Sequence, residues 1–210
     1  MHCHPLACRP FFWHDMGSKD CDRPPPADRS RRAFGTIHYP LSTIHYPLST
    51  IHYAMSAEER LSAKLAELGI QLPPAPEPKG VYKPLVVLGN LVYTSGHLPV
   101  AASGQLVTGR VGAELDVAAG YKAAQLAGLG ILASLRKELG SLDRIGRLVK
   151  VLGAVNCTPD FTQQPAVING CSELFAEIFG REAGIGARSA VGVNTLPLGV
   201  PVEIEAIFEI

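Results

Sequence analysis

The chain has 210 residues, of which 47% are hydrophobic and 18% charged, and these values fit one domain of ordinary size with a short additional segment. No apolar stretch reaches the roughly 18 to 20 residues that a membrane-spanning helix requires, so no transmembrane helix is expected. Residues 1–54 contain 6 basic and 4 acidic residues, which leaves 13 and 15, a net charge of −2, for residues 55–210. Because proteins that bind nucleic-acid phosphates usually carry clustered excess cations, we expect no nucleic-acid partner.

Residues 1–54 differ in character from the rest of the chain. The seven-residue unit TIHYPLS occurs twice and then a third time, with two changes, over residues 36–56. The segment also contains a run of three prolines and lacks the apolar periodicity of a helix or strand. We interpret it as a disordered leader, or as an untranslated one if Met55 is the true start, preceding a domain at residues 55–210.

The leader permits two other interpretations. Its cysteines and regularly spaced histidines could bind zinc, but a seven-residue spacing in a proline-interrupted chain does not bring four ligands together. Its arginines at residues 29–32 suit a mitochondrial import signal, whereas its four aspartates do not. Only Cys157 and Cys171 lie in the domain. Two thiols make no disulfide framework, so we expect a reducing, cytoplasmic location, with the mitochondrion as the alternative.

The domain opens with a helix signal. The sequence S-A-E-E at residues 56–59 forms a capping box, leucines follow at helical spacing, and Gly69 marks the end of the predicted helix. The next segment, residues 73–78, has four prolines among six residues. It cannot pair in a sheet, so we expect a stiff connector.

A hairpin and a long helix are predicted next. Two β-rich runs, residues 82–88 and 91–98, are separated by Gly89-Asn90, which tolerates positive φ at both positions of a two-residue turn. Residues 117–139 contain no proline and end in basic residues before Gly140, as suits the negative end of a helix dipole. Two glycines inside this helix are expected to allow close approach to a sheet.

The remaining elements complete the predicted fold. Residues 145–155 are β-branched and apolar and predict a buried strand, and residues 162–179 predict a second helix with one apolar face. Two strands, residues 188–195 and 200–210, flank a turn. This order predicts an α+β fold, with one mostly antiparallel sheet and two helices packed on one face.

The last two strands carry the candidate chemistry. Strand alternation places Arg188 on one face of its strand and Glu203 and Glu205 together on one face of theirs. Because a tight turn would make these strands neighbours, Arg188 is expected to approach one of the glutamates. The pair could be an exposed ion pair worth under about 1 kcal/mol. The alternative is a site in which the guanidinium binds a carboxylate and a partly desolvated glutamate acts as general acid or positions water. The pattern does not choose between Glu203 and Glu205.

Other candidates have simpler structural interpretations. Tyr82 could contact a substrate or pack in a half-buried strand. Ser95 and Gly96 could present backbone N–H groups to a ligand or form a bulge at a strand end. His97 is expected at the surface or in a structural role, and the two domain cysteines in the core.

Three segments together resemble the RidA/YjgF family. They are N-L-V-Y-T-S-G-H-L-P at residues 90–99, A-R-S-A-V-G-V at 187–193 and L-P-x-G-V-P-V-E-I-E-A-I at 196–207. The segment V-I-N-G-C-S-E-L-F at residues 167–175 resembles the longer L-PSP endoribonuclease/chorismate mutase-like branch of that family. Each motif alone is modest, and their order makes the set specific.

The resemblance implies a chorismate-mutase-like subunit in a homotrimer with clefts between neighbours. It implies that Arg188 holds the carboxylate of a small 2-imino or 2-enamino acid, or of the corresponding keto acid. Glu203, rather than Glu205, would position the water that releases ammonia. The resemblance also implies that Tyr82, Ser95, Gly96 and Asn169 line the cleft, and it implies no metal or organic cofactor.

The sequence departs from the family pattern in ways that bear on substrate range. Ala190 stands where some members have a cysteine, His97 replaces a frequent glutamine, and residues 55–78 precede the familiar core. Some relatives bind metabolites without strong deaminase activity and others are named ribonucleases. A non-catalytic metabolite-binding trimer and an endoribonuclease are therefore the alternatives.

Overall fold

The computed structural model describes residues 55–210, so the predictions about the leader lie outside the described residues. This part of the chain has helices α1 (Ala57–Leu68), α2 (Val117–Leu139) and α3 (Gln164–Phe179) and strands β1 (Leu85–Leu88), β2 (Leu91–Thr94), β3 (Arg147–Asn156), β4 (Ala187–Val193) and β5 (Val202–Glu209). Short 3-10 helices occur at Leu142–Arg144 and Pro197–Gly199. None of the described helices has the length and hydropathy of a membrane-spanning segment.

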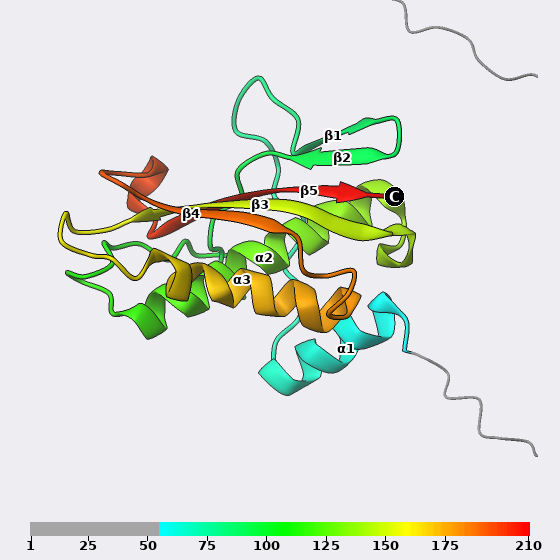
Figure 1. Ribbon diagram of the computed structural model, residues 1–210, viewed down its shortest axis with the longest axis horizontal. Coiled ribbons are helices and arrows are strands. Elements are labelled where there is room, and N and C mark those ends of the chain that lie inside the picture. The colour runs from blue at the N-terminus through cyan, green and yellow to red at the C-terminus, as the bar shows by residue number, and fades with distance from the viewer. Residues whose placement is uncertain (1–54) are drawn as a thin grey trace, which may run out of the picture. The chain divides into compact units, whose positions relative to one another are not determined.

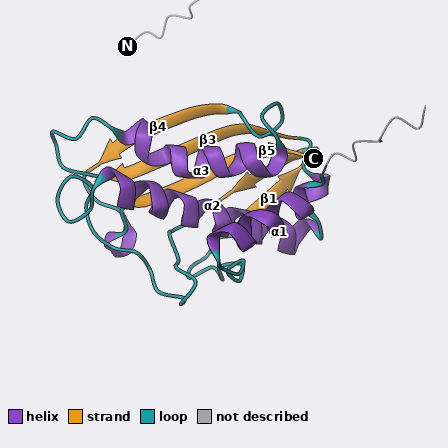
Figure 2. Ribbon diagram, turned by 90° about the horizontal axis from the view of Figure 1, so that it is seen from below, coloured by secondary structure: helices purple, strands orange, loops and turns teal. Residues whose placement is uncertain are grey.

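The strands form one sheet in the order β1-β2-β5-β3-β4, in which only β3 and β4 are parallel. Helices α2 and α3 lie across one face of this sheet, and α1 lies on the same side, against α3 (Figures 1 and 2). The predicted α+β fold, with a mostly antiparallel sheet and two helices on one face, is confirmed. Helix α1 is an addition to the helical layer.

The expectation that the last two strands are neighbours is wrong. Strand β3 lies between β4 and β5, pairing with β4 in parallel and with β5 in antiparallel register. The apolar side chains of β5 explain its central position, because Val202, Ile204, Ala206 and Phe208 are all buried against the helices. Strand β4 is largely exposed and lies at the edge.

Local signals in the first elements are confirmed with one refinement. Ser56 and Glu59 form the reciprocal capping box, and Gly69 ends α1 with φ of 64°. In the hairpin only Gly89 has positive φ, which fits a turn that requires glycine at its first central position alone. The two strands are shorter than predicted, so residues 82–84 and 95–98 belong to loops that extend beyond the hairpin.

The core lies between the sheet and the α2–α3 layer. Phe208 of β5 contacts Phe175 of α3 edge to face, with 5.5 Å between ring centroids. The expectation that glycines in α2 approach the sheet is wrong for Gly128. A Cβ there would lie 3.1 Å from Cys171 Sγ, so this glycine allows α2 to pack closely on α3. Each large apolar side chain buried in this layer contributes about 1.5–3 kcal/mol.

Candidate functional site

Strand β5 presents Glu203 on the face of the sheet that α2 and α3 leave open. Its neighbours Val202 and Ile204 are fully buried on the helical face, and strand alternation turns Glu203 the other way. The main chain of Ile204 also exchanges hydrogen bonds of 2.7 and 3.1 Å with His97. This bridge fixes the position of Glu203 against the loop that follows β2.

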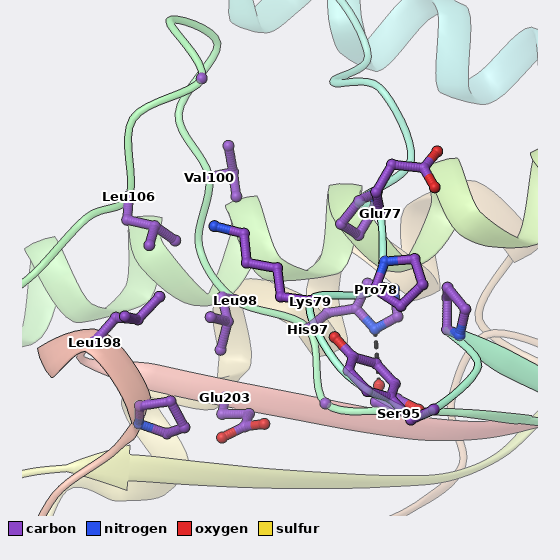
Figure 3. A pocket seen from close by; sticks show the side chains of 16 residues that line it. Glu77, Pro78, Lys79, Ser95, His97, Leu98, Val100, Leu106, Leu198 and Glu203 are labelled. Atoms are coloured by element: carbon purple, nitrogen blue, oxygen red, sulfur yellow. Dashed lines mark hydrogen bonds between the residues drawn. The ribbon is translucent and has the colours of Figure 1, made fainter.

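A pocket of about 840 Å³ opens in front of Glu203 (Figure 3). Three segments build its walls: the loop after β2, the turn before β5 and the whole segment before β1, residues 73–84, which is called the connector from here on and includes the proline-rich residues 73–78. The lining residues are Pro76, Glu77, Pro78, Lys79, Tyr82, Pro84, Ser95, Gly96, His97, Leu98, Val100, Gly104, Leu106, Pro197, Leu198 and Glu203. The predicted site residues Tyr82, Ser95, Gly96 and Glu203 are thus brought together.

The Glu203 carboxylate lies directly against Gly96. A Cβ at Gly96 would overlap with Glu203 Oε1, so only glycine fits beside the carboxylate in this arrangement. Partial burial, and secondarily the negative charge of Glu205, raises the pKa of Glu203 above the ordinary value of a glutamate. No hydrogen-bond donor within residues 55–210 contacts this carboxylate. Glu203 can therefore exchange a proton with a molecule in the pocket.

His97 has a structural role beneath the same wall. Its side chain is buried, with Nδ1 2.8 Å from the carbonyl oxygen of Ser95 and Nε2 2.8 Å from Ser134 Oγ in α2. Since a carbonyl can only accept, Nδ1 carries the proton and Nε2 accepts from the Ser134 hydroxyl. Burial lowers the pKa of His97, which favours this neutral form. Of the surface and structural roles expected for His97, the structural one is confirmed.

Arg188 lies elsewhere, at the edge of the sheet. It aligns with the buried Val151 of β3, so its side chain is on the helical face, where Nη1 donates to Asn169 Oδ1 at 2.7 Å and to Ser172 Oγ at 3.1 Å. The guanidinium borders a small hollow of about 230 Å³ and remains exposed. Helix α3 therefore orients Arg188 while leaving its other N–H groups available.

The expected approach of Arg188 to Glu203 does not occur within one copy of the chain. The two residues lie on opposite faces of the sheet and on strands separated by β3. Asn169 accompanies Arg188 rather than Glu203. One chain thus carries two half-sites, a pocket with a carboxylate and an edge with a guanidinium.

Two features of the pocket were missed from the sequence. The proline-rich connector, predicted only as a spacer, supplies one wall and places Lys79 in the pocket. Leu198 lines another wall with φ of 57°, the only positive value outside glycine among the described residues, and such strain often accompanies functional sites. Residues 55–210 contain no group of three or more side chains placed to hold a metal ion.

The fold and the pocket define an α+β subunit with a carboxylate at the open face of its sheet. A family profile described as "YjgF/chorismate_mutase-like, putative endoribonuclease" matches residues 61–204. The chain belongs to this family.

Individual relatives agree with this assignment. Protein TCP17 of Trypanosoma cruzi is 42% identical over 73% of this chain and 96% of its own length. The crystal structure of Atu1372 from Agrobacterium tumefaciens is 43% identical, covers 73% of this chain and 94% of its own, and has a TM-score of 0.66. A 2-iminobutanoate/2-iminopropanoate deaminase of Dermatophagoides farinae is 32% identical over 66% of this chain and 92% of its own length.

Proposed function

We propose that this protein hydrolyses small 2-imino and 2-enamino acids to 2-keto acids and ammonia, in clefts shared between copies of a homotrimer. The observation that carries the proposal is the Glu203 carboxylate, half-buried beside Gly96, with a raised pKa and no donor from the described residues. The similarity to a 2-iminobutanoate/2-iminopropanoate deaminase supports the same chemistry. The exposed guanidinium of Arg188 supplies the complementary group for a substrate carboxylate.

The reaction requires one base that later returns its proton. The imine reacts in its protonated form; for an enamine, the protonated Glu203 first donates its proton to the β-carbon, which gives the same protonated imine. The ionised Glu203 accepts a proton from water as the water oxygen bonds to the imine carbon and the C=N bond becomes single. Glu203 then donates that proton to the nitrogen, and it accepts the hydroxyl proton of the intermediate as the C–N bond breaks, ammonia leaves and the C=O bond of the keto acid forms. A raised pKa makes the carboxyl of Glu203 a stronger base when ionised than an ordinary glutamate, which favours its role as the proton acceptor.

The separation of the two half-sites supports the proposal of a cleft shared between copies. Arg188 of one copy would bind the substrate carboxylate while Glu203 of the neighbouring copy acts at the imine carbon. The open face of the sheet supports such assembly, because Val86, Leu88, Tyr93 and Val191 are 50%, 68%, 39% and 45% exposed there. Exposed apolar patches of this kind are typical of protein–protein interfaces.

The two described cysteines support a reducing, cytoplasmic location for this activity. Cys157 and Cys171 are both free and buried. Their thiols are therefore used as small apolar groups rather than as a disulfide, which is typical of reducing compartments.

The direct test is ammonia release from 2-iminobutanoate, generated in situ, by the full-length chain and its Arg188→Ala variant. We expect kcat/KM to fall by about 100-fold, because a charge-assisted bidentate contact to the carboxylate is lost. Arg147→Ala is the matched control, since Arg147 is an exposed arginine at the start of the adjacent strand β3. Unchanged hydrolysis in Arg188→Ala would exclude the proposed mechanism.

Two further assays, one with the wild type and one that adds a Glu203→Gln variant, distinguish the two alternative functions. Calorimetric binding of 2-oxobutanoate without ammonia release would indicate a metabolite-binding trimer that uses Arg188 as an anchor. RNA cleavage that survives purification and is lost in Glu203→Gln would indicate a ribonuclease. The charge of −2 on residues 55–210 gives that activity no electrostatic support.

A further inference from the structure

The pocket in front of Glu203 is much larger than a small imino acid requires. Even if each of its seven heavy atoms took the about 30 Å³ of a water molecule in the liquid, 2-iminobutanoate would occupy no more than roughly 200 Å³. The pocket volume of about 840 Å³ is in the range that binds larger ligands. The pocket of one copy therefore leaves space beyond the reacting carbon for the neighbouring copy's Arg188 and for a longer substrate side chain.

The walls of this additional space are mainly apolar. Leu98, Val100 and Leu106 come from the loop after β2, and prolines come from the connector. Leu198 completes the wall from a left-handed backbone conformation that a residue with a Cβ rarely adopts. The unfavourable conformation at a pocket-lining residue suggests that this wall has been shaped for a ligand.

One cation faces this apolar wall. Figure 3 shows the Lys79 side chain extending from the connector toward the loop that carries Leu98 and Val100. Glu77, two residues before Lys79, is paired with Lys137 at 2.8 Å. Lys79 is in no ion pair within residues 55–210.

Within residues 55–210 no ion pair joins Lys79 to the Glu203 carboxylate. The pocket thus has two separate polar ends, a carboxylate at Glu203 and an ammonium at Lys79, joined by apolar walls.

We propose that the connector is the specificity wall of this site and that the preferred substrate is a 2-imino acid whose side chain ends in a second carboxylate, bound by Lys79. This inference rests on the proposed imine hydrolysis. The first carboxylate binds Arg188 of the neighbouring copy, the methylene groups pack on the leucine and proline side chains, and the terminal carboxylate accepts hydrogen bonds from Nζ of Lys79. The Lys79 side chain is exposed where it lines the pocket, and its ammonium group attracts a terminal carboxylate but not a methyl group.

The test compares two substrates of equal length that differ only at the end of the side chain. They are 2-iminoglutarate and 2-iminopentanoate, each generated in situ by oxidation of the parent amino acid. Full-length protein is assayed as wild type, as Lys79→Met and as the control Lys83→Met. The Lys83 side chain is exposed and absent from the pocket lining, and its main-chain carbonyl, which accepts from Ser95, is unchanged by substitution.

We expect wild type and Lys83→Met to favour 2-iminoglutarate, and Lys79→Met to lose about tenfold in kcat/KM for this substrate alone. Equal kcat/KM values for the two substrates in the wild type, or equal losses for both in Lys79→Met, would overturn the inference while leaving imine hydrolysis intact.

Calorimetry with the keto-acid products separates this inference from the proposed function. If no imine is hydrolysed, but 2-oxoglutarate binds more tightly than 2-oxopentanoate and Lys79→Met abolishes the difference, the subsite stands and the deaminase does not. If neither keto acid is distinguished, the subsite is overturned as well.

Discussion

The Glu203 pocket and the Arg188 edge use opposite means to prepare a charged group. Glu203 is placed by the alternation of a central strand, partly desolvated and left without a donor among the described residues. Arg188 lies on an exposed edge strand, where two side chains of α3 orient it. The first arrangement changes the proton affinity of a carboxyl group, and the second fixes the direction of a cation that is always charged. Substitutions in the two regions should therefore impair activity in different ways.

The largest effect is expected at the contact between Gly96 and Glu203. Gly96→Ala places a Cβ where Glu203 Oε1 lies and must displace the carboxylate. We expect kcat for 2-iminobutanoate to fall by about 100-fold or more, as for loss of a positioned acid–base group. Gly80→Ala is the control, because a Cβ there meets only ordinary contacts with Tyr82 at 3.5 Å. Full activity in Gly96→Ala would show that Glu203 is not held where the chemistry needs it.

A smaller effect is expected at the Arg188 edge, and mainly on KM. Asn169→Ala removes the shorter of the two contacts to Arg188 Nη1, so the guanidinium loses its orientation but keeps its charge. We expect KM to rise about tenfold with little change in kcat, as for loss of about one charged hydrogen bond. Gln163→Ala, at the start of the same helix and without a side-chain cap bond, should behave as wild type. A fall in kcat alone would place Asn169 at the chemical step instead.

Beneath the pocket, Ser134→Ala should mainly cost stability. The substitution leaves Nε2 of the buried His97 without its donor, at a cost of about 1–3 kcal/mol. Thermal unfolding should show a lowered Tm, with only a few-fold change in kcat because the main-chain bridge from His97 to Ile204 remains. The exposed Ser62→Ala is the control. A Tm equal to that of wild type would mean that this contact adds nothing to the fold.

The smallest expected change is in the pH profile. Because the pKa of Glu203 is raised, activity that needs its ionised form should be lost, as pH falls, sooner than an ordinary glutamate predicts. The raised pKa also affects stability, because the protonated Glu203 carboxyl favours the folded state. This contribution to the free energy of unfolding is fully present below the unfolded pKa and is lost as pH rises through the folded pKa. Glu205→Gln removes the charge that contributes to the shift and should move the acidic limb to lower pH. A move to higher pH would contradict this assignment.

Local features were predictable from the sequence, and long-range pairing was not. The capping box at Ser56, the glycine turn of the hairpin and the bounds of α2 follow from residues close together in the chain. The position of β5 between β2 and β3 depends on contacts far apart in sequence, which strand alternation does not report. The predicted approach of Arg188 to a glutamate failed for this reason.

The site residues were likewise only partly predictable from the sequence. Motif resemblance named Tyr82, Ser95, Gly96 and Glu203, and the structure gathers them at one pocket. Nothing near His97 in the sequence indicates Ser134, its partner 37 residues away. Likewise the proline connector has no local sign that Lys79 faces the pocket, because only the folded path of residues 73–84 brings it there.

The most direct measurement mixes two inactive variants. Arg188→Ala and Glu203→Gln, each expected to be inactive alone, are co-expressed with different tags, and mixed assemblies are purified through both tags and assayed with 2-iminobutanoate. If each site takes Glu203 from one copy and Arg188 from its neighbour, these mixed trimers should show roughly a third of wild-type activity, because one of the three head-to-tail contacts in each of them joins the two intact residues. Mixed assemblies that stay as inactive as either variant would contradict a site shared between copies.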